Sequence, residues 1–190
     1  MQRRTFDRIV SWVGAGLTAI LLLAAGGLYY GYNYANDNVS AQLEPQNIVF
    51  PEGKALEDPR IEPYLRKYAG QKLTTGAQAE AYANHYIAVH LEDVADGKTY
   101  AELSTLARAN PQDQKLAGQV QTLFRGETLR GLLLTAYGFW KMGQLALIGS
   151  IVALAAGIAM AVMTVLGFRH VARVPQDQTM FVPRAQPVAG

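Results

Sequence analysis

The stretch from Gly131 to Phe168, GLLLTAYGFWKMGQLALIGSIVALAAGIAMAVMTVLGF, decides the fold of this chain. Its later part, residues 142–168, contains no charged side chain. A helix of that length would reach about 40 Å, which exceeds the roughly 30 Å hydrocarbon core of a bilayer. The sequence therefore predicts a transmembrane helix at residues 137–168.

A second uncharged and largely apolar stretch lies near the N-terminus, at residues 9–36. An arginine pair precedes it, as in a signal peptide. The apolar run is, however, longer than the roughly 7 to 15 residues of a signal-peptide core, and no convincing cleavage site follows. We therefore predict an uncleaved anchor with a transmembrane helix at residues 9–32, which makes the chain a two-span membrane protein.

Charge is segregated along the chain. Segments 1–8 and 169–190 together carry a formal charge of +4, whereas residues 33–141 carry −2. Because positively charged flanks stay in the cytoplasm, both terminal segments are expected there, with residues 33–136 on the far side of the membrane. Basic residues are not massed on one face, so nucleic acid is not an expected partner. The absence of cysteine excludes disulfides.

Small residues recur at every fourth position in both predicted spans. They are Gly149, Ala153, Gly157 and Ala161 in the second span, and Ala15 and Ala19 followed by Gly27 and Gly31 in the first. Such stripes let helix backbones approach closely in lipid. Either the two spans pack on each other or one stripe binds a partner subunit, and the pattern does not decide between these interpretations.

The region between the spans is predicted to be a small helical domain. Two capping boxes, TGAQ at 75–78 and TYAE at 99–102, mark helix starts, and Asn110 before a proline marks another. Residues 37–58 are interpreted as an extended linker whose apolar patch at 48–50 is a candidate for a brief strand. After Pro111 no proline occurs until Pro175, so the last helix is expected to be continuous with the second span.

The fold class predicted is therefore all-α, with two transmembrane helices and a small helical extracytoplasmic domain. The helix that starts after the first capping box is expected to run to about residue 95. Its periodicity predicts a core face of Ala83, Ile87, Leu91 and Val94.

Polar residues show no catalytic pattern. The serines lie outside nucleophile motifs, and no phosphate-binding glycine loop with its lysine occurs. His85 and His90 would lie about 140° apart on one helix, so they cannot share a metal without other ligands. We expect a solvated His85 and a half-buried His90. The predictions are no catalytic residue, no cofactor and no metal site.

Three charged residues precede the second span: Arg125, Glu127 and Arg130. Glu127 and Arg130 are spaced as an i, i+3 ion pair. Either Glu127 and Arg130 only form this ion pair, or the three residues bind a lipid headgroup or a partner at the outer surface.

The runs AYANHYIAVHLEDVADGKTY at 81–100 and QTLFRGETLRGLLLTAYGFWKMG at 121–143 carry a family resemblance. The chain resembles an uncharacterised family of two-span membrane proteins from actinobacteria, some of which carry a label of aromatic-ring-opening dioxygenase. The resemblance implies a bacterial cell membrane as the location. We reject the dioxygenase activity for this chain, because the iron ligands it needs are not displayed.

Two classes of function remain. The first is a non-catalytic accessory or scaffold subunit of an envelope or respiratory membrane complex, with lipid and other membrane subunits, or a second copy, as partners. The second is a module, in one form a homo-oligomer, that binds a lipid or apolar molecule. The second class would be favoured by a continuous apolar pocket lined by Tyr82, Tyr86, Ile87, Leu103 and Leu123. An enzyme is the least favoured class.

Overall fold

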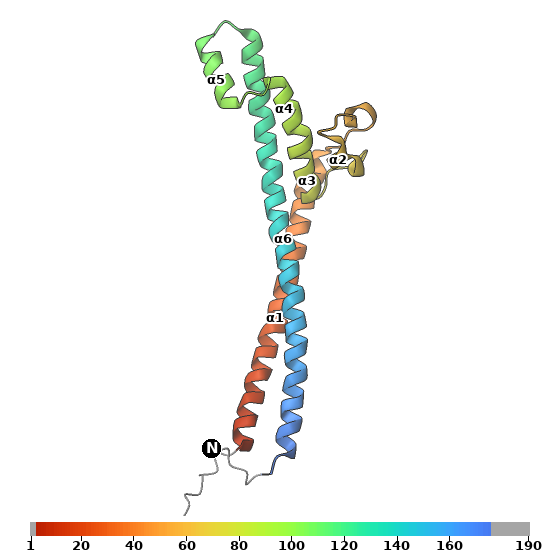
Figure 1. Ribbon diagram of the computed structural model, residues 1–190, viewed down its shortest axis with the longest axis vertical. Coiled ribbons are helices and arrows are strands. Elements are labelled where there is room, and N and C mark those ends of the chain that lie inside the picture. Colours follow the sequence, from red (N-terminus) through yellow and green to blue (C-terminus); the bar gives the residue numbers. More distant parts are fainter. Residues whose placement is uncertain (1–2, 176–190) are drawn as a thin grey trace, which may run out of the picture. The chain divides into compact units, whose positions relative to one another are not determined.

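The computed structural model describes residues 3–175 (Figure 1). Helix accounts for 84% of the chain and no strand forms among these residues, so the all-α prediction is confirmed. In chain order the elements are α1 (Arg3–Leu43), η1 (Glu44–Gln46), η2 (Gly53–Leu56), α2 (Glu62–Leu65), η3 (Arg66–Tyr68), α3 (Gly76–Tyr82), η4 (Ala83–Ile87), α4 (Ala88–Ala95), α5 (Tyr100–Ala109) and α6 (Gln114–Arg173).

Two helices, α1 and α6, are long and apolar enough to cross a membrane. The chain divides into two compact units, which are described separately below. The paired-helix unit comprises residues 1–30 and 146–190, and the middle unit comprises residues 31–145.

In the paired-helix unit, the first part of α1 and the last part of α6 run antiparallel. Trp12 packs edge-on against Phe168 with ring centroids 5.6 Å apart, and Ala25 at the other end accepts a hydrogen bond from Ser150. Large apolar side chains such as Leu23 and Met163 point outward and are 77% and 63% exposed. Water would not favour such a surface, which is compatible with a two-pass membrane protein.

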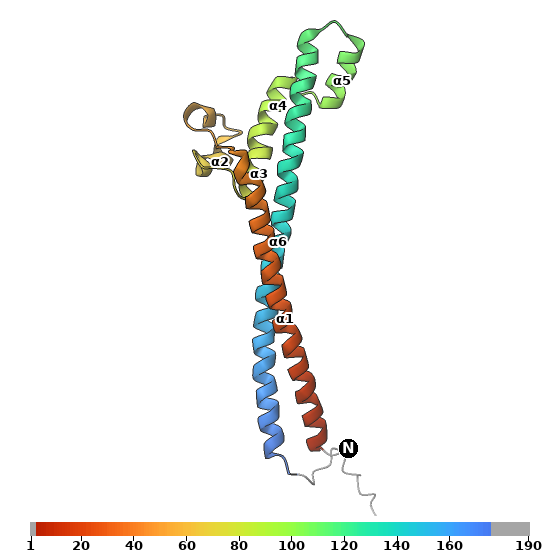
Figure 2. The same cartoon turned by 180° about the vertical axis from the view of Figure 1, so that it is seen from behind.

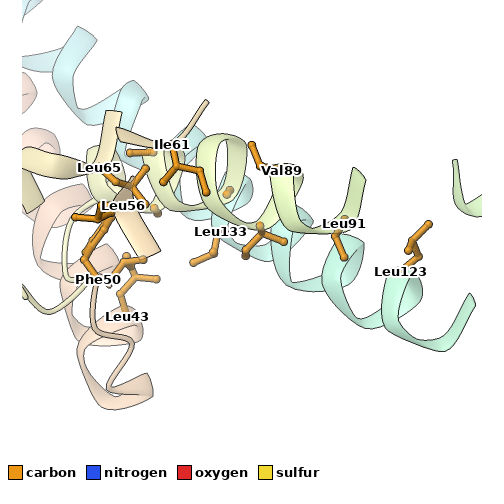
Figure 3. Packing of buried hydrophobic residues seen from close by; sticks show 14 of the residues in the cluster. Leu43, Phe50, Leu56, Ile61, Leu65, Val89, Leu91, Leu123 and Leu133 are labelled. Atoms are coloured by element: carbon orange, nitrogen blue, oxygen red, sulfur yellow. The ribbon is translucent and has the colours of Figure 1, made fainter. Parts of the chain in front are cut away.

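The middle unit holds the hydrophobic core of the chain. The end of α1, the loop that follows it, the α3–α4 segment, α5 and the first part of α6 all contribute buried side chains. Figure 3 shows part of this core, in which Phe50 and Leu65 are 1% and 0% exposed. Figures 1 and 2 both show α5 beside the first turns of α6.

The predicted extended linker at 37–58 is wrong in its first part, because α1 continues to Leu43. No proline or glycine interrupts the chain between Gly31 and Pro45, and Pro45 stops the α-helix by disfavouring helical geometry before it. The apolar patch at 48–50 is extended but forms only an isolated antiparallel bridge, between Val49 and Lys72. Phe50 anchors it by donating its backbone N–H to Gln71.

The predicted helix after the first capping box exists, but its middle is a π-helix at η4. A π turn inserts one extra residue, so every later side chain rotates by about 100° relative to an α-helix. Three of the four predicted core residues, Ala83, Ile87 and Leu91, are buried, but Val94 is 37% exposed and Ala95 is buried in its place. The predictions for both histidines are wrong: His85 is half-buried, where it stacks on Tyr64, and His90 is exposed.

The start of the last helix also differs from the prediction. Asn110 does not cap it; its side chain donates to the carbonyl of Leu106 and closes α5. Asp113 takes the capping role, because its carboxylate accepts the backbone N–H of Leu116 at 2.9 Å.

Candidate functional site

The small residues of the second span lie against α1 within the paired-helix unit. A Cβ added at Gly157 would lie 3.0 Å from the nearest methyl carbon of Leu22, and one at Gly149 would lie 3.2 Å from Leu28. Ala153 and Ala161, on the same face, are half-buried. Leucine side chains of α1 thus occupy this side of α6, which favours packing between the two spans over docking of a partner there.

The small residues of the first span are placed differently. A Cβ added at Gly27 or at Gly31 would meet no atom within 4 Å. Gly27 is exposed in the paired-helix unit, and Gly31 belongs to the middle unit. The structure therefore does not bring these two glycines into the contact that Gly149 and Gly157 make.

A buried hydroxyl strengthens the contact of the two helices. Ser150 is 7% exposed and donates to the carbonyl oxygen of Ala25 at 2.8 Å. The sequence did not predict this interhelical role of Ser150, because the serines were compared only with nucleophile motifs. The available signal was a polar side chain within an otherwise apolar run, beside one of the small residues.

The three charged residues before the second span do not act as one group. Arg130 donates to Glu127 at 2.9 Å and 3.1 Å and reaches Asn84 of the π-helix at 3.4 Å. Asn84 in turn donates to Glu80 at 3.0 Å. This network ties α6 to the α3–α4 segment, whereas Arg125 is exposed.

The histidines have structural partners. His85 stacks on Tyr64 with ring centroids 3.4 Å apart and planes 2° apart, and a ring nitrogen of His90 lies 2.8 Å from the carbonyl oxygen of Tyr86. Within residues 3–175 no group of three or more metal-ligating side chains is positioned to hold an ion.

An electrostatic cluster lies at Arg60, which joins Asp58 at 2.7 Å and Asp93 of α4 at 3.0 Å. Hydrogen bonds from Arg60 lower the pKa of Asp58 below its ordinary value, and both aspartates raise the pKa of Arg60. The cluster attaches the segment before α2 to α4, and its groups are partly exposed.

The five residues of the predicted apolar pocket all belong to the hydrophobic core of the middle unit or pack against it. Tyr82 and Tyr86 are neighbours, with centroids 4.9 Å apart, and burial raises the pKa of Tyr82. Leu123 instead lines a groove with Leu91 and Tyr100. Leu103 and Ile87 are core residues.

A different apolar groove, of about 390 Å³, lies in the middle unit between the end of α1 and α6. Val39 and Leu43 line it from α1, and Leu133, Ala136 and Phe139 line it from α6. Asn38 and Gln42 add amide groups at its edge. Apolar walls with a few polar groups are typical of sites for small apolar ligands.

An exposed aromatic pair lies in the middle unit, where the start of α5 meets α6. Tyr100, at the start of α5, and Phe124 of α6 have ring centroids 6.0 Å apart and remain 41% and 54% exposed. Leu106 of α5 is also exposed, at 41%.

Comparison with protein-family models, with curated proteins and with solved structures gives no match to the chain. The actinobacterial family resemblance accordingly stays a prediction.

Proposed function

We propose that this chain is a non-catalytic integral membrane protein that serves as an accessory or scaffold subunit of a bacterial envelope or respiratory membrane complex. Both termini lie in the cytoplasm and the middle unit lies outside. The charge of +4 on the end segments and −2 between them supports this orientation. The bounds of α6, Gln114–Arg173, support an outer helix that is continuous with the second span.

The observation that carries the proposal is the exposed aromatic pair of Tyr100 and Phe124. These rings lie in the middle unit, outside the apolar stretches that lipid would cover, and they leave part of their surface to solvent. Aromatic residues are enriched at protein–protein interfaces, where they supply large contact areas at low entropic cost. We therefore assign the partner contact to the surface around this aromatic pair.

Purification in mild detergent with quantitative mass spectrometry tests the assignment. We expect a membrane protein partner at fixed stoichiometry with the wild-type chain and its loss with Phe124→Gln. Gln121→Ala, an exposed polar position three residues earlier on α6, is the control and should keep the partner. Recovery of the chain without a stable partner would contradict the proposal.

Single cysteines test the orientation, because the natural chain has none. Ala109→Cys, at the end of α5, should react with a membrane-impermeant thiol reagent in intact cells. Phe6→Cys, near the start of α1, should react only after permeabilisation. The opposite pattern would invert the proposed topology.

A second candidate function, binding of a lipid or apolar molecule, is favoured by the groove between α1 and α6 in the middle unit. Ala136→Phe would fill the groove, whereas Gly138→Ala adds a methyl where nothing lies within 4 Å. If the groove binds a ligand, a co-purifying apolar molecule should be lost from the first variant and kept by the second. Equal ligand content in both would exclude the groove.

A further inference from the structure

The end of the paired-helix unit at which α1 begins and α6 finishes contains a cleft of about 730 Å³ between these two helices. Arg4, Arg8 and Trp12 line it from α1, at positions one helical turn apart on one face. Phe168 and Val171 line it from α6. The cleft thus combines two guanidinium groups with an apolar floor.

The two arginines of the cleft are available for an anion. Within residues 3–175 neither Arg4 nor Arg8 forms an ion pair, since the nearby carboxylate of Asp7 faces α6 and lies 3.7 Å from His170. Arg3, Arg169 and Arg173 add positive charge to the same end of the unit. Two guanidinium groups one turn apart offer several N–H donors, which match the oxygens of a phosphate group.

The apolar part of the cleft distinguishes a lipid from a free ion. Trp12 packs edge-on against Phe168 but remains 64% exposed, and the neighbouring Ile9 and Val13 are 51% and 57% exposed. Toward the centre of both helices the outward surface stays apolar. An inorganic phosphate would leave this floor bare, whereas the acyl chains of a phospholipid would cover it.

We propose that this cleft is a specific site for an anionic glycerophospholipid of the cytoplasmic leaflet. Arg4 and Arg8 hold its phosphate, and Trp12 with Phe168 contacts the glycerol and the first part of the acyl chains. The inference rests on the membrane insertion in the proposed function, but it requires neither a protein partner nor the groove in the middle unit.

Native mass spectrometry of the full chain, with phosphatidylglycerol and phosphatidylcholine titrated in detergent, tests the site. The wild-type chain should retain phosphatidylglycerol in preference to phosphatidylcholine. Arg4→Gln with Arg8→Gln should lower its apparent affinity at least about tenfold, since each arginine contributes separately. Arg169→Gln with Arg173→Gln removes the same charge from the same end of the unit but leaves the cleft lining intact. This double variant should lower the apparent affinity for phosphatidylglycerol less than about twofold.

Equal losses in the two double variants would overturn the site in favour of diffuse attraction to the whole basic end. An unchanged affinity in the cleft variant, or equal retention of the two lipids by the wild type, would also overturn it. If inorganic phosphate alone displaces the lipid at the same occupancy, the cleft is a phosphate site and the lipid assignment is wrong.

The wild-type chain gives a second measurement that does not depend on a folded variant. Phosphatidylglycerol with brominated acyl chains should quench tryptophan emission more than brominated phosphatidylcholine at equal mole fraction, and equal quenching would overturn the proposal. Alkaline carbonate extraction separates this inference from the proposed function. Release from membranes would reject insertion and both proposals, whereas retention without lipid preference would reject only the lipid site.

Discussion

Ser150 of α6 donates a 2.8 Å hydrogen bond to the backbone carbonyl oxygen of Ala25 in α1, and the two residues are 7% and 5% exposed. Most of the other contacts near this bond are made by small and apolar groups, such as Gly149 against Leu28 and Gly157 against Leu22, which tolerate sliding along the helix axis. A hydroxyl that must meet one carbonyl fixes the register of the pair.

Ser150→Ala should lower the free energy of unfolding by about 0.5–1.5 kcal/mol, because it removes this interhelical hydrogen bond. Unfolding of the detergent-solubilised chain by increasing SDS, followed by circular dichroism, measures the change. Thr128→Ala is the control: its exposed hydroxyl bonds only to Phe124 of its own helix. An equal loss in both variants would mean that the Ser150 bond does not join the helices.

Gly157→Leu should destabilise the isolated chain by about 1–3 kcal/mol, the usual cost of overpacking. The first added carbon would already lie 3.0 Å from a methyl carbon of Leu22 and 3.4 Å from the Cβ of Leu21. The variant should still insert, because leucine raises the hydrophobicity of the span. Unfolding in SDS measures the loss, and membrane fractionation checks insertion.

Gly27→Leu is the matched control, since a side chain there meets nothing within 4 Å. It should keep or slightly raise stability, because leucine is a better helix former than glycine. If Gly157→Leu proves as stable as Gly27→Leu, the stripe on α6 does not contact α1.

Gly76→Ala should destabilise the middle unit by about 1–3 kcal/mol. An added Cβ would lie 2.3 Å from the Cβ and 2.4 Å from the Cγ of Trp140, so α3 and the indole must move apart. Gly118→Ala of α6, with nothing within 4 Å, should instead stabilise by about 0.5–1 kcal/mol. Thermal unfolding of both variants checks the opposite signs; a stable Gly76→Ala chain would show that Trp140 can turn aside freely.

The elements that sequence reasoning predicted well are those with local chemical signals. Both capping boxes form as expected, at Thr75 with Gln78 and at Thr99 with Glu102, because their hydrogen bonds involve residues three apart. The charge-free runs likewise predicted the two helices that are long and apolar enough to span a membrane. In these cases the cause and the structure lie within one short segment.

The end of α1 at Leu43 and the cap at Asp113 were local errors, whereas other errors involve features that the sequence pattern does not show. The π turn at Ala83–Ile87 leaves no periodic signal, yet it rotates the rest of the segment and exchanges Val94 for Ala95 in the core. At the candidate site, the small-residue stripe was visible in the sequence, but the leucines of α1 that occupy it were not. The basic and aromatic cleft was also hidden, because Arg8 and Phe168 are 160 positions apart along the chain.

The two capping boxes differ in one respect that predicts different responses to pH. The first has a neutral Gln78 at its third position, and the second has an ionisable Glu102. Hydrogen bonds from the backbone N–H and the hydroxyl of Thr99 lower the pKa of Glu102 in the folded chain. A lowered folded-state pKa means that the stabilisation is complete above the ordinary glutamate pKa of about 4.3 and is lost as pH falls through the folded value.

At pH 7, Thr99→Ala and Thr75→Ala should each cost about 1 kcal/mol, the usual effect of losing a helix cap. Near pH 3 the cost of Thr99→Ala should shrink, because protonated Glu102 no longer accepts both hydrogen bonds in the wild type. The cost of Thr75→Ala should stay the same, since Gln78 does not titrate. Glu102→Gln should make the second box behave like the first. Thermal unfolding midpoints of the four chains across this pH range measure the effect, and a parallel pH dependence of both threonine variants would show that Glu102 is not its source.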